Sequence, residues 1–264
     1  MENPFFSIVV VSFNAEQIIA KTINSVLEQA FENYEIIVKD GLSKDNTLEN
    51  IPKSEKIRVY STKDSGIYDA MNEAVGYANG EYICFLNCGD FFAHTGVLSD
   101  ISAAIQKSQC SVVYGDYKRK GVVQRQPNTL SDFDLYRSPL CHQTMFIKKQ
   151  LFQIHGNYDT SFKICADWCH TVKTFKAKET YFHCDTVVCD YQGGGASETQ
   201  KGLEIKREET KRIRESHFSS DEIRRFDKKI SHSFFKLRQK MASDKAPKWV
   251  RKLYRWCVGK YNSR

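Results

Sequence analysis

Long apolar runs, a secretory leader and paired cysteines are all missing from the 264-residue sequence. The longest apolar runs are short, such as residues 8–11, whereas a membrane-spanning helix needs about 20 apolar residues. The N-terminus has neither the basic region nor the apolar core of a signal peptide. We therefore expect a chain that does not cross a bilayer and stays in the cytoplasm.

The cysteines are also typical of a cytoplasmic protein. There are 9 of them, an odd number, in apolar surroundings and without CxxC spacing. A composition of 41% hydrophobic and 27% charged residues also excludes a disulfide miniprotein, a collagen-like fibre and a mostly disordered chain. The cysteines are therefore predicted to be reduced thiols, most of them buried.

Charge is distributed unevenly along the chain. Residues 1–200 carry 19 Lys and Arg against 24 Asp and Glu, while residues 201–264 carry 20 against 8, within an overall net charge of +7. This contrast predicts a main domain over residues 1–200 and a basic helical tail over residues 201–264.

Strand and helix patterns alternate through the first part of the chain. The pattern predicts strands at residues 7–12, 34–39, 57–61 and 82–86, the first of them buried on both faces. Residues 18–29 and 67–78 show helical spacing. Such alternation predicts an α/β fold with a mostly parallel, twisted sheet, which binds ligands beyond the carboxyl ends of its strands. Polar residues follow all four strands, and three of these strand ends carry Asp.

Four successive motifs resemble the signatures of glycosyltransferase family 2. They lie at residues 5–14, 36–47, 64–72 and 78–90, and weaker matches follow at residues 141–143, 166–168 and 194–197. The resemblance implies the Rossmann-like GT-A fold and an enzyme that transfers a sugar, with inversion, from a nucleotide-diphosphate sugar held with Mn²⁺ or Mg²⁺.

The resemblance also implies roles for individual residues. Asp167 matches the base that deprotonates the acceptor, Asp90 the metal ligand, and His142 and Gln143 residues near the acceptor or the phosphates. Asp40 would accept from a base N–H such as that of uracil. The residues expected around the nucleotide sugar are Ser12, Asn14, Asp40, Ser43, Asp64, Asn72 and Asn87.

Each of these residues could instead have a purely structural role. Asp40 with Ser43, and Asp64 with its neighbours, could only organise turns, as Asp and Ser often do. Asp167 could be a helical surface acid, and His142 a hydrogen-bonded core residue. The sequence also has Asn87 and Gly89 where many family members have carboxylates, so the diphosphate and water would have to supply most of the metal ligands.

Missing motifs narrow the function further. The first strand is followed by neither a GxGxxG turn nor a glycine-rich basic loop, which argues against a nicotinamide oxidoreductase and a sugar nucleotidyltransferase. The QxxRW motif of processive synthases is absent, so addition of one sugar is expected. The acidic body argues against nucleic acid as a partner. A non-catalytic carbohydrate or membrane adaptor remains the alternative.

The tail carries two helical patterns. Residues 219–222 resemble a capping box, and residues 245–264 form a basic amphipathic segment with interfacial tryptophans. We expect this segment to hold the protein on an anionic membrane, at the inner face of the plasma membrane, near a glycan or lipid-linked acceptor. The alternative is a helix packed on the main domain or on a partner subunit, which would allow a homo-oligomer through the C-terminal helices.

Overall fold

A computed structural model describes residues 3–242 of the chain. The segment 245–264, on which the membrane prediction depends, lies outside these residues. The chain divides into two compact units, Met1–Ile213 and Arg214–Arg264, and each is described by itself. The first unit therefore continues past Lys201, where the charge pattern placed the domain boundary.

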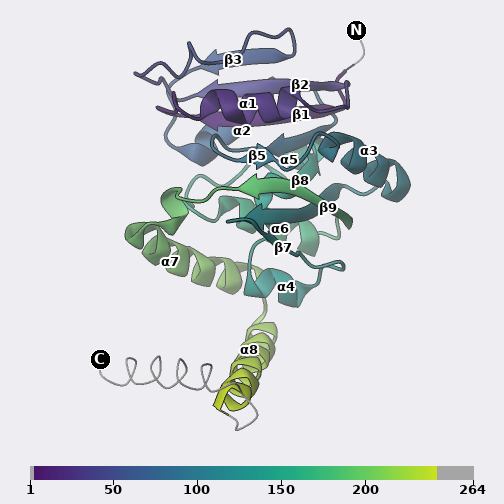
Figure 1. Ribbon diagram of the computed structural model, residues 1–264. Helices are drawn as coiled ribbons and strands as arrows, with labels where there is room; N and C mark the ends of the chain where they lie inside the picture. Colours follow the sequence, from purple (N-terminus) through teal and green to yellow (C-terminus); the bar gives the residue numbers. More distant parts are fainter. Residues whose placement is uncertain (1–2, 243–264) are drawn as a thin grey trace. The chain divides into compact units, whose positions relative to one another are not determined.

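The first unit begins as the sequence predicts. Strand β1 (Phe6–Ser12), helix α1 (Ile19–Leu27), strands β2 (Tyr34–Asp40) and β3 (Ile57–Ser61), helix α2 (Ile67–Tyr77) and strand β4 (Tyr82–Phe85) follow one another. Strand β1 pairs in parallel with both β2 and β4, and β2 pairs in parallel with β3. Figure 1 shows β2 and β1 stacked beneath β3.

The second half of this unit extends the same sheet. Its strands are β5 (Phe91–Phe92), β6 (Val112–Arg119), β7 (Val122–Gln124), β8 (Met145–Lys148) and β9 (Tyr181–Tyr191). Its helices are α3 (Val97–Ser108), α4 (Asp132–Arg137), α5 (Gln150–His155) and α6 (Ala166–Lys176), with 3₁₀ turns η1 (His142–Thr144) and η2 (Ala196–Glu198). Among the described residues the sheet order is β3-β2-β1-β4-β8-β6-β9-β5, with β7 beside β6.

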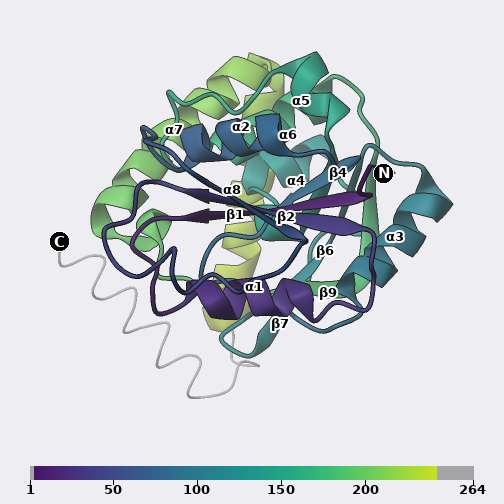
Figure 2. The same cartoon turned by 90° about the horizontal axis from the view of Figure 1, so that it is seen from above.

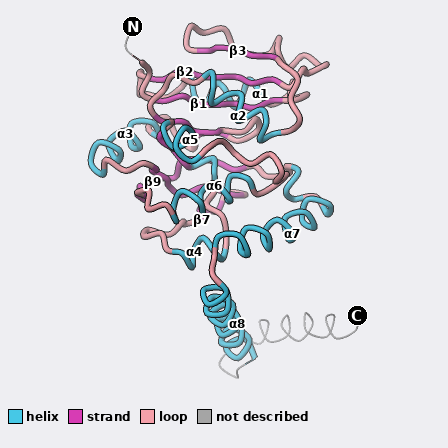
Figure 3. Tube along the Cα trace, turned by 180° about the vertical axis from the view of Figure 1, so that it is seen from behind, coloured by secondary structure: helices cyan, strands magenta, loops and turns pink. Residues whose placement is uncertain are grey.

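The sheet is mixed in this half. Strand β8 is antiparallel to both of its neighbours, β4 and β6, while β6 and β9 are parallel to each other. Strand β8 starts at Met145, directly after Gln143 and Thr144 of η1. Figure 3 follows the strands from β3 to β9 from behind.

Helices cover both faces of the sheet. Alternate residues of β1, such as Ile8 and Val10, form a buried cluster with Ile23 of α1 and Ile101 of α3. Val9 points to the opposite face because side chains alternate along a strand. Figure 2 shows α1 on one side of β1 and β2, with α2 and α6 on the other.

Strand register places polar residues side by side at one edge of the sheet. Ser12 of β1 is the partner of Asp40 of β2, and Asp40 is in turn the partner of Ser61 of β3. All three are the last residues of their strands. Parallel pairing thus builds a polar edge where the sequence predicted ligands to bind.

The C-terminal helices follow β9. Helix α7 (Gln200–His217) starts in the first unit and ends in the second, and α8 (Ser220–Ala242) lies in the second. The predicted capping box is confirmed: Glu222 N donates to Ser219 Oγ at 3.2 Å, and Ser219 N donates to the Glu222 carboxylate at 2.8 Å. Within residues 3–242, no helix is long and apolar enough to span a membrane.

Candidate active site

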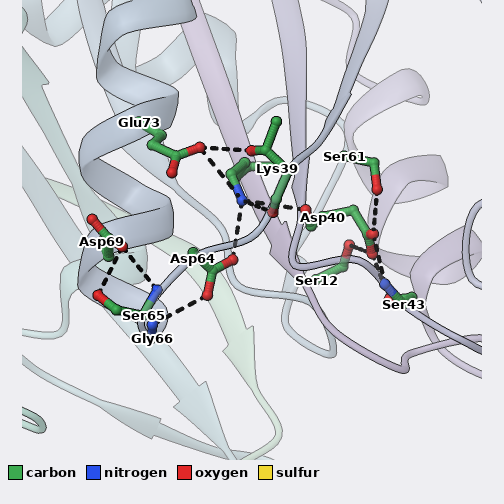
Figure 4. A network of polar contacts seen from close by, with 11 residues as sticks. Ser12, Lys39, Asp40, Ser43, Ser61, Asp64, Ser65, Gly66, Asp69 and Glu73 are labelled. Carbon is green, nitrogen blue, oxygen red and sulfur yellow. Dashed lines mark hydrogen bonds and ion pairs between the residues drawn. The ribbon is translucent and has the colours of Figure 1, made fainter.

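Asp40 lies in a cage of serine hydroxyls at the polar edge. Ser12 Oγ donates to Asp40 Oδ1 at 3.2 Å, Ser61 Oγ donates to Oδ2 at 2.9 Å, and Ser43 donates through both its hydroxyl and its backbone N–H. We call Asp40 with Ser12, Ser43 and Ser61 the serine cage (Figure 4). Burial alone would raise the pKa of Asp40, but these hydrogen bonds outweigh it and lower that pKa below its usual value.

The loops after β1 and β2 are joined beside this cage. Asn14 N donates to Ser43 Oγ at 2.8 Å, and Lys44 N donates to Asn14 Oδ1 at 2.9 Å. Asn14 has a positive φ of 48°, which Asn tolerates better than most residues. The predicted residues Ser12, Asn14, Asp40 and Ser43 are therefore neighbours at one edge.

A buried lysine that sequence reasoning missed connects this edge to Asp64. The Lys39 side chain is fully buried, and its Nζ lies 3.0 Å from Asp64 Oδ2 and 3.6 Å from Glu73 Oε2. It also donates to the backbone oxygens of Asp40 and Thr62. Figure 4 shows the ammonium group between these oxygens. A lysine directly after the apolar run 36–38 of a buried strand was the signal that could have revealed it.

Asp64 also organises the start of α2. Its Oδ1 accepts from Gly66 N at 3.1 Å, while Ser65 donates to Asp69. A Cβ at Gly41 would lie 2.9 Å from Asp64 Oδ2, so glycine allows this close approach. The turn predicted for residues 64–66 is present, and the Asp64 carboxylate is held beside the serine cage.

Asn72 faces a different segment of the chain. Its amide donates to Tyr158 O and accepts from Tyr158 N, both at 2.9 Å. This pair of bonds holds the segment before α6 against α2. The nucleotide-sugar role expected for Asn72 stays a prediction, and the bonds give the residue a positioning function.

Asp90, which follows β4, contacts Gln143, which precedes β8. Gln143 Nε2 donates to Asp90 Oδ2 at 2.8 Å, and Gln192 N donates to Asp90 Oδ1 at 2.9 Å. Asp90 is 6% exposed, and this burial raises the pKa of its carboxyl despite the two hydrogen bonds. Gln192 was not expected from the sequence, because only its backbone N–H takes part.

His142 links Asn87 to Asp167. The Asn87 amide nitrogen lies 2.9 Å from His142 Nε2, and His142 Nδ1 lies 3.1 Å from Asp167 Oδ2. With the Asn87 amide donating to Nε2, the proton of the neutral ring sits on Nδ1 and faces Asp167. A carboxylate therefore holds the imidazole in one tautomer.

Tyr68 completes the surroundings of Asp167. Its hydroxyl lies 2.6 Å from Asp167 Oδ1 and 2.7 Å from Ile164 O. Burial alone would raise the pKa of Asp167, but the contacts with His142 and Tyr68 outweigh it and lower that pKa. Asp167 is therefore ionised at neutral pH. Tyr68 is four residues from Asn72 in α2, and this i, i+4 spacing could have placed both on one helix face.

The short turn η1 joins these contacts into one network. His142 and Gln143 are consecutive, so the turn connects Asp167 and Asn87 on one side with Asp90 on the other. We call Asn87, Asp90, His142, Gln143 and Asp167 the η1 network. The residues expected from the sequence to act on the sugar are thus brought together by a single turn.

The oxygens in this network suit a hard cation, but only as part of its shell. Asn87 Oδ1 is buried and has no hydrogen-bond partner among the described residues. Asp90 contributes a carboxylate, and such oxygens are the ligands that Mg²⁺ and Mn²⁺ prefer. No group of three metal-binding side chains occurs within residues 3–242, so a ligand such as a diphosphate would have to supply the remaining oxygens.

Comparison with known sequences identifies relatives. The profile described as Glycosyl transferase family 2 matches residues 7–171. A PGL/p-HBAD biosynthesis glycosyltransferase of Mycobacterium bovis is 31% identical over 215 residues, covering 75% of this chain and 81% of the relative. An Escherichia coli UDP-Glc:alpha-D-GlcNAc-diphosphoundecaprenol beta-1,3-glucosyltransferase, WfgD, is 33% identical over 121 residues, covering 45% of this chain and 47% of that protein.

Solved structures share the fold. The crystal structure of S. aureus TarS 1-349 in complex with UDP-GlcNAc superposes with a TM-score of 0.63 at 21% identity. The match covers 76% of this chain and 64% of the TarS chain. It confirms the expected GT-A architecture, a sheet flanked by helices on both faces.

Proposed function

The chain belongs to glycosyltransferase family 2, and on this premise we propose an inverting, non-processive enzyme. It moves one sugar from a nucleotide-diphosphate sugar, a UDP-sugar, to a glycan or lipid-linked acceptor. The reaction serves assembly of a bacterial surface polysaccharide or oligosaccharide. The names of the relatives support this choice, since one acts on a diphosphoundecaprenol-linked sugar and the TarS complex contains UDP-GlcNAc.

The observation that carries the proposal is the η1 network. It places an ionised carboxylate, Asp167, and a second carboxylate, Asp90, on the two sides of one turn. Sugar transfer needs two such groups with different tasks, because a proton must leave the acceptor while negative charge develops on the leaving diphosphate. The two pKa values shift in opposite directions, as two different tasks require.

Asp167 acts as the base. It takes the proton of the acceptor hydroxyl while that oxygen forms a bond to the anomeric carbon and the bond from this carbon to the diphosphate breaks. The nucleoside diphosphate leaves with the electron pair. His142 and Tyr68 contact the two oxygens of Asp167 and keep the carboxylate ionised and oriented.

The polar edge receives the nucleotide. Phe13 is 63% exposed, and its ring and Asp64 Oδ2 both lie near the position of a Gly41 Cβ, so it offers a face for a base to stack on. The serine cage fixes the loops that surround this face. Mn²⁺ or Mg²⁺, held by Asp90, by Asn87 Oδ1 and by the diphosphate, would neutralise charge on the leaving group.

The test is a screen of nucleotide sugars, UDP- and GDP-linked, for thermal shift and for release of free nucleotide diphosphate, with and without Mn²⁺. We expect one donor to stabilise the protein and to be turned over when acceptor is present. A donor that binds without release of nucleotide diphosphate under every condition would favour the adaptor alternative. A protein that none of the nucleotide sugars stabilises would contradict the proposed function.

Asp167→Asn tests the base directly. Loss of general-base catalysis should lower turnover about 10²- to 10⁴-fold while the donor still stabilises the protein. Asp185→Asn is the matched control, since the Asp185 side chain is 85% exposed and forms an ion pair with Arg125. Unchanged turnover in Asp167→Asn would remove this residue from the base role.

Membrane association through residues 245–264 is a separate part of the proposal. It rests on the basic, tryptophan-containing sequence, with each cation near an anionic surface contributing about 1 kcal/mol. Flotation with anionic liposomes should recover the full chain but not a chain ending at Asp244. Equal recovery would contradict membrane binding, and a change of oligomeric state on truncation would support the alternative of a homo-oligomer through the C-terminal helices.

A further inference from the structure

A carboxylate of α7 binds the backbone just before α6. Glu209 is 7% exposed, and its two oxygens accept from three consecutive backbone N–H groups, those of Lys163, Ile164 and Cys165. The latter two bonds measure 3.0 and 2.9 Å. These N–H groups precede the first turn of α6, where a negative charge also interacts favourably with the helix dipole.

The same backbone reaches Asp167 by a short route. Ile164 donates its N–H to Glu209, and the carbonyl of Ile164 lies 2.7 Å from the Tyr68 hydroxyl. That hydroxyl is also the one that lies 2.6 Å from Asp167 Oδ1. Glu209 is therefore connected to the proposed base through one peptide unit and one hydroxyl, without touching the base itself.

Further contacts hold the rest of the 158–165 segment between α2 and α7. Arg212, three residues after Glu209, donates to Ser161 Oγ at 2.5 Å and lies 3.9 Å from the centre of the Phe162 ring. On the α2 side, Asn72 holds Tyr158 through both of its amide groups. The segment that leads into α6 is thus attached to two helices, one of which lies outside the matched residues 7–171.

We propose that Glu209 is a positioning residue that sets the orientation of Asp167 by holding the backbone of residues 163–165. The proposal rests on the proposed role of Asp167 as the base. Without the Glu209 carboxylate, three N–H groups near the protein interior lose their acceptor, and the segment must move to satisfy them. Ile164 then shifts relative to Tyr68, and Tyr68 shifts relative to Asp167. A displacement of about 1 Å at a catalytic group can cost about 10² in rate.

The test compares Glu209→Gln with Glu208→Gln. Both remove one negative charge from the same helix, and Glu208 is exposed. In Glu209→Gln the amide nitrogen would face backbone N–H groups, so we expect kcat to fall about tenfold to a hundredfold while the donor KM stays unchanged. Glu209→Asp keeps the charge on a shorter side chain and should fall between this variant and wild type. Glu208→Gln should match wild type.

A measurement without turnover separates this proposal from the proposed function. Titration of the Asp167 carboxyl by ¹³C NMR should show a higher pKa in Glu209→Gln than in wild type and in Glu208→Gln, because displacement of Tyr68 weakens the hydrogen bond that its single hydroxyl proton makes to Asp167 Oδ1. An unchanged titration, or equal losses of kcat and donor affinity, would overturn the positioning role. If wild type transfers no sugar yet the titration shifts as expected, the proposed function fails and the positioning role of Glu209 stands.

Discussion

The serine cage and the η1 network both bury carboxylates, but only the cage is complete by itself. Asp40 is fully buried and accepts from three hydroxyls and a backbone N–H, and its pKa is lowered. Asp90 accepts from two N–H groups, its pKa is raised, and the nearby Asn87 Oδ1 has no partner among the described residues. The cage satisfies its own polar groups, whereas the η1 network keeps capacity for a ligand at some cost in stability.

This difference assigns separate tasks to the two regions. A closed set of hydrogen bonds fixes the shape of the loops that receive a nucleotide, and it needs no ligand to do so. Buried groups that are incompletely satisfied cost free energy and concentrate at functional sites. Substitutions in the cage should therefore act mainly on stability, and substitutions in the η1 network mainly on activity.

The largest expected effect comes from Lys39→Met, beneath the cage. Removing this buried cation takes the ionic partner from Asp64 and Glu73 and the donor from two backbone oxygens, and breaking a buried ion pair costs about 3–5 kcal/mol of unfolding free energy. Chemical denaturation measures the loss. Lys44→Met, an exposed lysine in the following loop, is the control and should stay within about 0.5 kcal/mol of wild type. Equal stability of the two variants would show that the buried lysine contributes nothing.

Asp40→Asn should have the next largest effect. An amide has one accepting oxygen, so at least one cage hydrogen bond is lost, at about 1–3 kcal/mol. The contribution of a carboxyl with a lowered pKa is full above its unfolded value of about 3.9 and disappears as the pH falls through the folded value. The gap between wild type and Asp40→Asn should therefore narrow below about pH 4. A gap that stays constant down to pH 2 would contradict ionisation as its source.

His142→Gln should spare stability and change the pH dependence of turnover. His142 lowers the pKa of Asp167, so its removal raises that pKa and moves the acid limb of kcat/KM to higher pH. At neutral pH we expect about a tenfold loss, or about 1.4 kcal/mol of transition-state stabilisation. An unshifted acid limb would show that His142 does not act through Asp167.

The sequence predicts the cage better than the η1 network, for a physical reason. Ser12, Asp40 and Ser61 end the three consecutive strands β1, β2 and β3, and parallel pairing alone puts them side by side. Asp167 and Tyr68 are 99 positions apart and meet only after α2 and α6 have packed. Periodicity cannot place such pairs, so the roles of His142, Gln143 and Asp167 came from the family resemblance alone, whereas Asn87 and Asp90 also follow a predicted strand.

Some features were predicted neither by the sequence pattern nor by the family resemblance. Gln192 acts through its backbone N–H, so its side-chain type carries no signal. The antiparallel direction of β8 was not expected, because alternating strands and helices predict parallel pairing. Glu209 resembled one of many charges in a basic helix, since nothing in the sequence shows that its carboxylate is buried.

Asp90→Asn should have the smallest effect on stability, and any change should be a gain, whereas Asp40→Asn gives a loss. Because the folded pKa of Asp90 is raised, folding with the charged carboxylate carries a penalty that grows as the pH rises above about 4. At pH 7 the neutral amide removes this penalty, and the Gln143 amide can turn its oxygen toward the new nitrogen, so that no donor is left unpaired. We therefore expect equal stability or a gain of about 0.5 kcal/mol, disappearing near pH 3. Turnover should still be lost, because the amide cannot replace the charge. The same Asp→Asn change in the cage destabilises the protein, so matched denaturation curves at pH 7 compare the two regions directly. A loss in Asp90→Asn as large as that in Asp40→Asn would show that both carboxylates serve the fold.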